Sequence, residues 1–268
     1  MEESGYSTPP PKGSKGSGKP KAAVDISRLF GEFDASKVHL ERLDLSSYDK
    51  DYAANPRLAI YLHNILSPQE CEGLIALSES REYEAALVNI GRGSQQRMDD
   101  VRNNDRAIID DEAISTLIYN RVCAVLTPEG EAALHERHLP VYNGSSRAAH
   151  PPAMTTWRAV GFNERLRFLR YDPGTYFAPH MDGSYERDDP SHPKYGEKSL
   201  VTAQIYLNQG FEGGATRMMG RNLSDGYDVV PRTGSVLVFQ HDIFHEGSVL
   251  IAGRKYTIRT DVMYARSS

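Results

Sequence analysis

The sequence predicts an α+β fold in which a layer of helices precedes an antiparallel barrel or jelly roll. Three observations predict it. Apolar residues recur at spacings of three and four in the first half of the chain, and from Arg165 onward short runs of β-branched and aromatic residues alternate with turn signals. The chain also has 268 residues with 39% hydrophobic content, which is enough for one large core.

The first half begins with an apolar run, Arg57 to Leu66, which we interpret as a strand. Ser67-Pro68-Gln69-Glu70 follows it and combines an N-cap, a proline at the first helical position and a glutamate three residues after the cap. This pattern predicts the start of a helix. A second helix is predicted over 114–126, because apolar residues recur there at helical spacing and the pattern stops before Pro128. We expect both helices to form a layer outside a sheet.

The second half predicts strands separated by turns. The runs are RLRFLRY (165–171), LVTAQIYL (200–207), ATRMM (215–219), SVLVF (235–239) and KYTIRTDVMY (255–264). Asp-Pro-Gly, Glu-Gly-Gly, Pro-Arg-Thr-Gly and Ala-Gly sequences lie between them and mark turns. Short strands at this spacing are typical of an antiparallel barrel or jelly roll.

Composition restricts the function. The formal net charge is −5, so no excess of positive charge favours nucleic acid or an anionic membrane as a partner. Only two cysteines occur, Cys71 and Cys123, which does not predict a disulfide framework. No apolar run has the roughly 20 residues needed to span a bilayer, and the first residues given lack the apolar core of a secretory signal. We therefore expect an intracellular protein, cytoplasmic or nuclear, that acts on a peptide, a protein or a small molecule.

The domain organisation follows from the same composition. Residues 1–24 are rich in Pro, Gly, Ser and Lys and are expected to form a disordered tail. Residues 25–268 are expected to form a single domain, with a helix-rich support over 57–160 and a jelly-roll core over 162–266.

The stretch RYDPGTYFAPHMDG places His180 and Asp182 two positions apart after a turn. An H-x-D pair alone is weak evidence of a site, but residues i and i+2 of an extended segment project to the same side and can bind one ion. His241 and His245 both follow the predicted strand 235–239, and either of them can supply a third ligand. Two histidines and one carboxylate with open positions are typical of non-haem Fe(II) oxygenases.

If the cosubstrate of such an iron site is a 2-oxo acid, the site should also contain a cation that can bind the far carboxylate of that acid. Lys255 lies ten residues after His245 on the next predicted strand, where it shares a face with Thr257 and Arg259. Arg254 and Arg259 remain alternatives, because a guanidinium binds a carboxylate through two hydrogen bonds.

The sequence resembles the Fe(II)- and 2-oxoglutarate-dependent dioxygenases, specifically the prolyl 4-hydroxylase-like group. FNERLRFLRYDPGTYFAPHMDGSY, LVTAQIYLNQGFEGGATRM and GSVLVFQHDIFHEGSVLIAGRKYTIRTDVMY carry the resemblance, which covers roughly 57–266 and is strongest over 162–264. It implies a double-stranded β-helix (jelly-roll) barrel. It also implies a dioxygenase that hydroxylates an unactivated C–H bond and converts 2-oxoglutarate to succinate, with Fe(II), 2-oxoglutarate and O2 required and L-ascorbic acid as an optional addition.

The resemblance also implies roles for individual residues. His180, Asp182 and His245 would bind iron and act as the catalytic centre, and Lys255 would pair with the distal carboxylate of 2-oxoglutarate. Tyr171 matches a tyrosine that lines the cosubstrate pocket, Tyr206 matches one that hydrogen-bonds the same carboxylate, and Thr202 shares the face of Tyr206. The offset to Lys255 and the adjoining Glu246-Gly247 favour His245 over His241 as the third ligand.

Several alternatives remain open on the sequence alone. Each tyrosine can equally be a core aromatic residue. The charged positions Glu164, Arg167 and 101–106 (VRNNDR), together with Asn163, either line the substrate opening or form a solvated face, and the solvated face is the favoured interpretation. The other function classes are a non-catalytic jelly-roll binding module and a cupin-type metalloenzyme. The identity of the substrate does not follow from the residues.

Overall fold

The computed structural model describes residues 29–91, 94–128, 130–140 and 154–267. Its helices are η2 (Ala35–Lys37), α1 (Lys50–Ala54), α2 (Pro68–Glu79), α3 (Glu112–Val125) and α4 (Ala132–His135). The tail expected over 1–24 lies outside the described residues. Among the described residues, no helix combines the length and the apolar composition that crossing a membrane requires.

Two larger sheets and two small strand pairs make up the β structure. The ten-stranded sheet contains β1 (His39–Arg42), β2 (Ala59–His63), β3 (Glu84–Ala85), β6 (Asp105–Asp110), β7 (Glu136–Pro140), β8 (Met154–Phe162), β9 (Arg165–Tyr171), β11 (Lys198–Tyr206), β15 (Ser235–Gln240) and β18 (Lys255–Arg266). The four-stranded sheet contains β10 (Phe177–His180), β13 (Thr216–Met219), β14 (Gly226–Val229) and β16 (Phe244–Gly247). The pairs are β4 (Val88–Gly91) with β5 (Ser94–Gln96) and β12 (Glu212–Gly213) with β17 (Leu250–Ala252).

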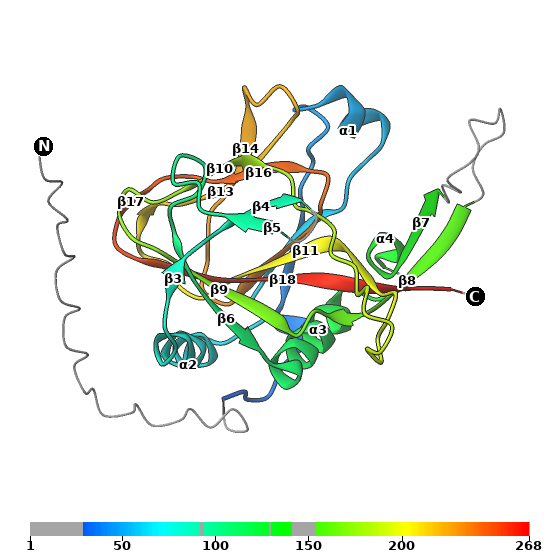
Figure 1. Ribbon diagram of the computed structural model, residues 1–268, viewed down its shortest axis with the longest axis horizontal. Helices are drawn as coiled ribbons and strands as arrows, with labels where there is room; N and C mark the ends of the chain where they lie inside the picture. Colours follow the sequence, from blue (N-terminus) through cyan, green and yellow to red (C-terminus); the bar gives the residue numbers. More distant parts are fainter. Residues whose placement is uncertain (1–28, 92–93, 129, 141–153, 268) are drawn as a thin grey trace, which may run out of the picture.

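The two larger sheets form the jelly-roll barrel that the sequence predicts. The large sheet runs in the order β1-β2-β15-β11-β18-β9-β6-β3, and the small sheet in the order β10-β16-β13-β14. Figure 1 shows the small sheet on one side of the large sheet and helices α2 and α3 on the other. Tyr206 and Phe239 of the large sheet pack with Met218 and Val229 of the small one, so the two sheets share an apolar layer.

Strand β18 determines which side chains face the helices and which face the small sheet. It lies between β11 and β9 in the large sheet, and its residues alternate between two faces. Ile258 and Val262 belong to the apolar core that includes the helices, whereas Lys255 and Arg259 line a pocket between the sheets. The alternation expected from the sequence is therefore observed, and it supplies two cations to the barrel interior.

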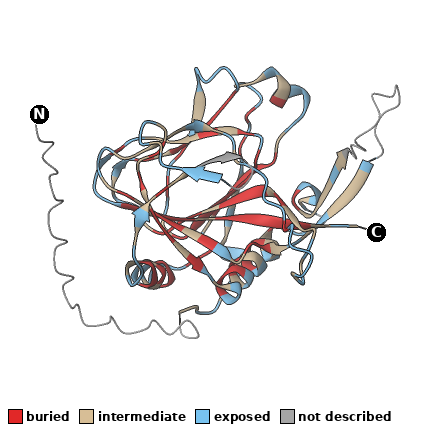
Figure 2. Ribbon diagram, in the orientation of Figure 1, coloured by how far each residue is buried: buried red, intermediate tan, exposed pale blue. Residues whose placement is uncertain are grey.

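The helical layer packs against the outer face of the large sheet. Leu74 of α2 and Ile118 of α3 are fully buried in the same core as the sheet residues, and Figure 2 shows the buried faces of both helices turned toward the sheet. Glu70 of α2 accepts hydrogen bonds at 2.8 and 2.9 Å from Arg121 of α3. This buried ion pair joins the two helices beneath the barrel.

We expect Ser67→Ala to lower the free energy of unfolding by about 1 kcal/mol, the usual effect of removing an N-cap. The Ser67 hydroxyl accepts from the Glu70 amide, and the Glu70 carboxylate accepts in return from the Ser67 amide. Urea denaturation measures the change. Ser224→Ala, at an exposed position, is the control and should change stability by less than about 0.5 kcal/mol. Equal effects of the two substitutions would contradict the capping role.

The sequence predicted helices α2 and α3 and strands β2, β9, β11, β13, β15 and β18. The predicted strand at 165–171 has the bounds of β9, and the predicted helices correspond to α2 and α3. The expectation of a helix-rich segment over 57–160 missed strands β6, β7 and β8, which extend the large sheet on the β9 side. Strand β6 was not predicted because its apolar residues are few and lie between charged ones.

Candidate metal centre

Three potential metal ligands converge in a pocket that is lined by residues of both larger sheets. His180 ends β10 and is the direct register partner of His245 on the neighbouring strand β16, and Asp182 lies two residues beyond β10. The ligand atoms of the three residues all lie within 4.8 Å of one another. Asp182 Oδ1 is 3.9 Å from His180 Nε2, and Asp182 Oδ2 is 3.8 Å from His245 Nε2. This spacing allows one ion to contact all three side chains.

Both imidazoles present Nε2 to the centre. His180 Nδ1 lies 2.8 Å from the carbonyl oxygen of Ala178, and His245 Nδ1 lies 3.1 Å from that of Ile243. Because a carbonyl oxygen only accepts, each Nδ1 carries the proton and each Nε2 keeps a free lone pair. Burial lowers the pKa of His180 to about 3 and also lowers the pKa of His245, so both rings are neutral at physiological pH.

Two side chains hold the Asp182 carboxylate. The Thr202 hydroxyl donates to Oδ2 at 2.5 Å, and Arg259 Nη2 lies 2.9 Å from Oδ1. Burial alone would raise the pKa of Asp182, but the Arg259 guanidinium holds it well below its ordinary value. Asp182 is therefore an ionised and oriented carboxylate. Two neutral imidazoles and one carboxylate are a donor set that fits Fe(II).

A second buried carboxylate extends this network away from the centre. Asp261 lies 3.0 Å from Arg259 Nη2 and 3.2 Å from Arg167 Nη1. His241 belongs to this part of the structure, because its Nε2 is 3.4 Å from Asp261 Oδ1 and it is not in the ligand cluster. Of the two histidines that the sequence left as candidates, His245 is the one that the fold places beside His180 and Asp182.

Lys255 lies at the start of β18 in the interior of the barrel. It is only 2% exposed, and its Nζ donates to the carbonyl oxygen of Gly214 at 2.6 Å. The same Nζ is 4.8 Å from the ring centre of Tyr171 and 6.0 Å from that of Tyr206. Burial lowers the pKa of Lys255 to about 7. Arg254, by contrast, is half exposed and pairs with Asp172 at 2.6 Å.

The remaining predicted site residues lie at different depths. Tyr171 lines the pocket with Lys255, and burial raises the pKa of its hydroxyl. Tyr206 is fully buried in the apolar layer between the sheets, and its hydroxyl donates to Thr216 at 2.8 Å. Thr202, expected beside Tyr206 on the cosubstrate side, instead contacts Asp182. The even spacing of 202 and 206 gave their common face, but four residues of extended chain separate them by about 13 Å.

Sequence reasoning considered the run VRNNDR as lining for the substrate opening but favoured a solvated face, and for Arg102 the favoured interpretation was wrong. Arg102 is 9% exposed and lines the same pocket as the three candidate ligands. Its Nε donates to Asn104 Oδ1 at 2.8 Å, and its guanidinium lies 4.4 Å from the ring centre of Phe177. The Phe177 ring stacks in turn on His180 at 3.6 Å. Asn163 is buried as well, so the solvated-face interpretation was wrong for both residues.

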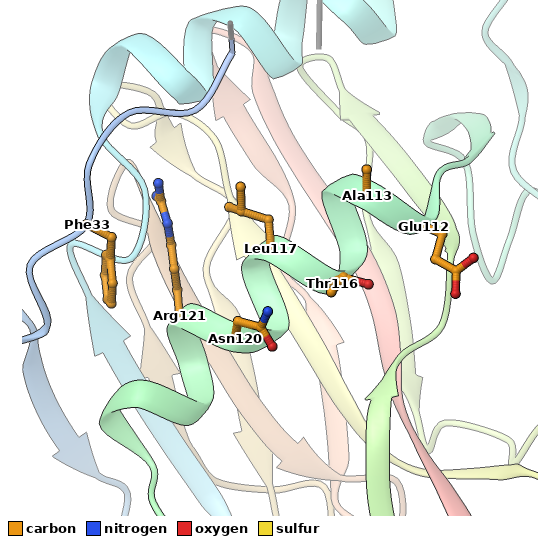
Figure 3. Close-up of a pocket in the computed structure, with 7 residues that line it drawn as sticks. All are labelled: Phe33, Glu112, Ala113, Thr116, Leu117, Asn120 and Arg121. Atoms are coloured by element: carbon orange, nitrogen blue, oxygen red, sulfur yellow. The ribbon is translucent and has the colours of Figure 1, made fainter. Parts of the chain in front are cut away.

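Judged by pocket size alone, the functional site would be placed at helix α3 and not at the three candidate metal ligands. A pocket of about 700 Å³ lies along the outer face of α3, whereas the cavity at the metal ligands is only about 40 Å³. Figure 3 shows Phe33 and Arg121 at one end of the α3 pocket and Glu112 at the other. The lining is mostly apolar and contains no cluster of metal ligands among the described residues. The chemistry therefore favours the smaller cavity.

Comparisons with known proteins agree with this choice. A family model described as the 2OG-Fe(II) oxygenase superfamily matches residues 166–260, a range that contains the three candidate ligands and Lys255. Prolyl 4-hydroxylase 1 of Arabidopsis thaliana is 25% identical over 253 residues, which cover 87% of this chain and 76% of that protein.

Two solved structures have the same fold. A prolyl-4-hydroxylase from Pseudomonas putida matches with a TM-score of 0.50 and 19% identity, covering 82% of this chain and 99% of that one. A prolyl hydroxylase from Trichoplax adhaerens, in complex with a peptide fragment of the hypoxia inducible factor oxygen degradation domain, matches with a TM-score of 0.51 and 15% identity. That match covers 81% of this chain and 88% of the other.

Proposed function

Because the chain belongs to the 2OG-Fe(II) oxygenase superfamily, with similarity to prolyl 4-hydroxylases, we propose that His180, Asp182 and His245 bind Fe(II) and that Lys255 binds the distal carboxylate of 2-oxoglutarate. The protein is a prolyl 4-hydroxylase-like, Fe(II)- and 2-oxoglutarate-dependent hydroxylase. The observation that supports these residue roles best is the register of β10 and β16, which places two free Nε2 atoms beside an ionised carboxylate.

When bound, iron supplies the O2 activation that converts 2-oxoglutarate to succinate and CO2 and hydroxylates a C–H bond. The protein itself orients the reactants. Ala178 and Ile243 carbonyls fix the two imidazoles, while Thr202 and Arg259 fix the carboxylate. Lys255, a buried cation without a carboxylate partner in the described part of the chain, orients the cosubstrate. Tyr171 covers one side of that cation.

The proposed substrate is a prolyl residue in a peptide or protein. The support is the similarity to Prolyl 4-hydroxylase 1 and to a prolyl hydroxylase solved with a peptide. We also propose that 25–268 is one catalytic domain, because the large sheet includes both β1 and β18. Cys71 and Cys123 are free thiols, which is consistent with the proposed intracellular location.

Titration of the Fe(II)-loaded protein with 2-oxoglutarate under nitrogen tests the function. We expect a weak visible charge-transfer band, because the cosubstrate chelates the metal through its keto acid. A non-catalytic binding module or a cupin-type metalloenzyme with other chemistry would give no such band. Mass spectrometry of cell extract treated with the enzyme should then detect products heavier by one oxygen atom, formed only when 2-oxoglutarate is present.

The affinity for 2-oxoglutarate should fall as the pH rises above 7. The charged form of Lys255 binds the carboxylate, and burial places its pKa at about 7, so binding at higher pH requires uptake of a proton. The dissociation constant should increase by up to about tenfold per pH unit between pH 7.5 and 9. Calorimetry with the Mn(II)-loaded protein measures it. Lys255→Arg keeps its charge over this range and should remove the dependence, and an equally steep curve for that variant would contradict the assignment.

A further inference from the structure

We propose that Arg102 binds a carboxylate of the primary substrate, so that the compound hydroxylated here is an acid with its carboxylate close to the reacting carbon. The inference rests on the proposed function and adds the chemical class of the substrate to it. Two sources of the carboxylate share this chemistry: a free carboxylic acid, such as an amino acid or a peptide C-terminus, and an acidic side chain within a peptide.

Arg102 is a buried cation that faces the pocket. It is 9% exposed, and its hydrogen bond to Asn104 uses Nε and leaves the two terminal nitrogens. Within the described ranges no carboxylate lies in ion-pair contact with it. A buried guanidinium without an anion is costly, and it becomes favourable when a ligand supplies the missing charge. Burial and the neighbouring cations Arg259 and Arg106 lower the pKa of Arg102 to about 10, so it stays charged.

The third arginine or lysine that lines the pocket is already paired. Arg259 lies in ion-pair contact with both Asp182 and Asp261. In the described part of the chain, Lys255 and Arg102 are the two pocket cations without a carboxylate partner. One of the cosubstrate's carboxylates is assigned to Lys255 and the other to the metal. Both carboxylates of 2-oxoglutarate therefore have partners, and an anion that binds Arg102 must come from another molecule.

The position of Arg102 also fits a substrate contact. Its guanidinium lies 4.4 Å from the ring centre of Phe177, and that ring stacks on the ligand His180. The Phe177 ring therefore lies between Arg102 and His180, and an anion bound to Arg102 would lie close to the metal ligands. A planar guanidinium binds a carboxylate through two parallel hydrogen bonds, which orients the bound group as well as attracting it.

The test uses the full-length protein loaded with Fe(II) and 2-oxoglutarate under nitrogen. The probes are matched pairs: the N-acetyl amino acids against their primary amides, and N-acetyl-X-Pro amides in which X is Asp or Glu against those with Asn or Gln. Perturbation of the visible band measures binding, and admission of air followed by mass spectrometry measures hydroxylation. We expect one acid series to bind at least about tenfold more tightly than its neutral partners, which also identifies the source of the carboxylate.

Arg102→Gln should remove this preference, with a loss of about 10- to 100-fold in acid affinity and little change for the amides. Arg102→Lys should be intermediate, because it keeps the charge without the two parallel bonds. Arg97→Gln is the matched control: it removes an arginine from the same segment, but Arg97 is largely exposed and pairs with Asp99. It should keep the full preference.

The outcomes separate this inference from the proposed function. If 2-oxoglutarate produces no visible band in the unsubstituted protein, the proposed function fails and the inference fails with it. If the band forms but no acid binds better than its amide, the function stands and the role of Arg102 is overturned. The same conclusion holds if Arg102→Gln or, where that variant does not fold, Arg102→Lys keeps the complete preference.

Discussion

His245→Ala is expected to lose iron and turnover together, whereas His241→Ala keeps its iron. His245 Nε2 faces Asp182 across 3.8 Å, and alanine leaves a two-residue donor set at that position. A change in an outer partner of a metal ligand typically costs 10- to 100-fold in affinity or activity, and loss of a ligand should exceed about 100-fold. Metal content after desalting and 2-oxoglutarate-dependent succinate formation measure the two effects.

The two histidines form a closely matched pair. Both are 7% exposed and lie four residues apart, so each substitution opens a similar cavity. They differ in what they face, because His241 lies beside Asp261 and outside the ligand cluster. Loss of iron in His241→Ala with retention in His245→Ala would reverse the assignment. Equal loss in both variants would indicate a general effect on folding and not the loss of a ligand.

Local patterns predicted strands β9, β11, β15 and β18 of the large sheet, because their signals lie within one segment. Strand β9 has the predicted bounds, and the alternation along β18 predicted that Lys255 and Arg259 face away from Ile258. Strands β10 and β16 were not predicted, since each has four residues and carries a polar histidine where an apolar residue would indicate a strand. These two strands nevertheless bring His180 and His245 together.

The incorrect interpretation of Arg102 has a related cause. Arg102 lies in a polar run, and nothing within that run distinguishes a buried arginine from an exposed one. Its burial results from contact with Phe177, 75 residues later in the chain. Thr202 shows the same limit, since strand register gave its face correctly but not its neighbour Asp182, which lies on a different segment. The sequence alone did not predict which residues from distant segments contact each other.

Lys255→Met should raise the dissociation constant for 2-oxoglutarate by about 10- to 100-fold while iron binding is kept, because a charge-assisted hydrogen bond to a carboxylate is lost. Methionine fills a similar volume without the charge. Calorimetry with the Mn(II)-loaded protein measures the affinity, and metal content measures the retained site. Arg254→Met is the matched control, since it removes a neighbouring cation that is half exposed and paired with Asp172.

Stability should distinguish a binding role of Lys255 from a structural one. Lys255 is 2% exposed with a single backbone acceptor, Gly214, so the folded protein bears the cost of burying its charge. Lys255→Met removes that cost, and its thermal unfolding temperature should not fall. A stabilised protein with weakened 2-oxoglutarate binding is the combination expected of a residue retained for its ligand. A destabilised variant with unchanged affinity would identify Lys255 as part of the core and leave the distal carboxylate to Arg259, the other candidate cation that lines the cavity.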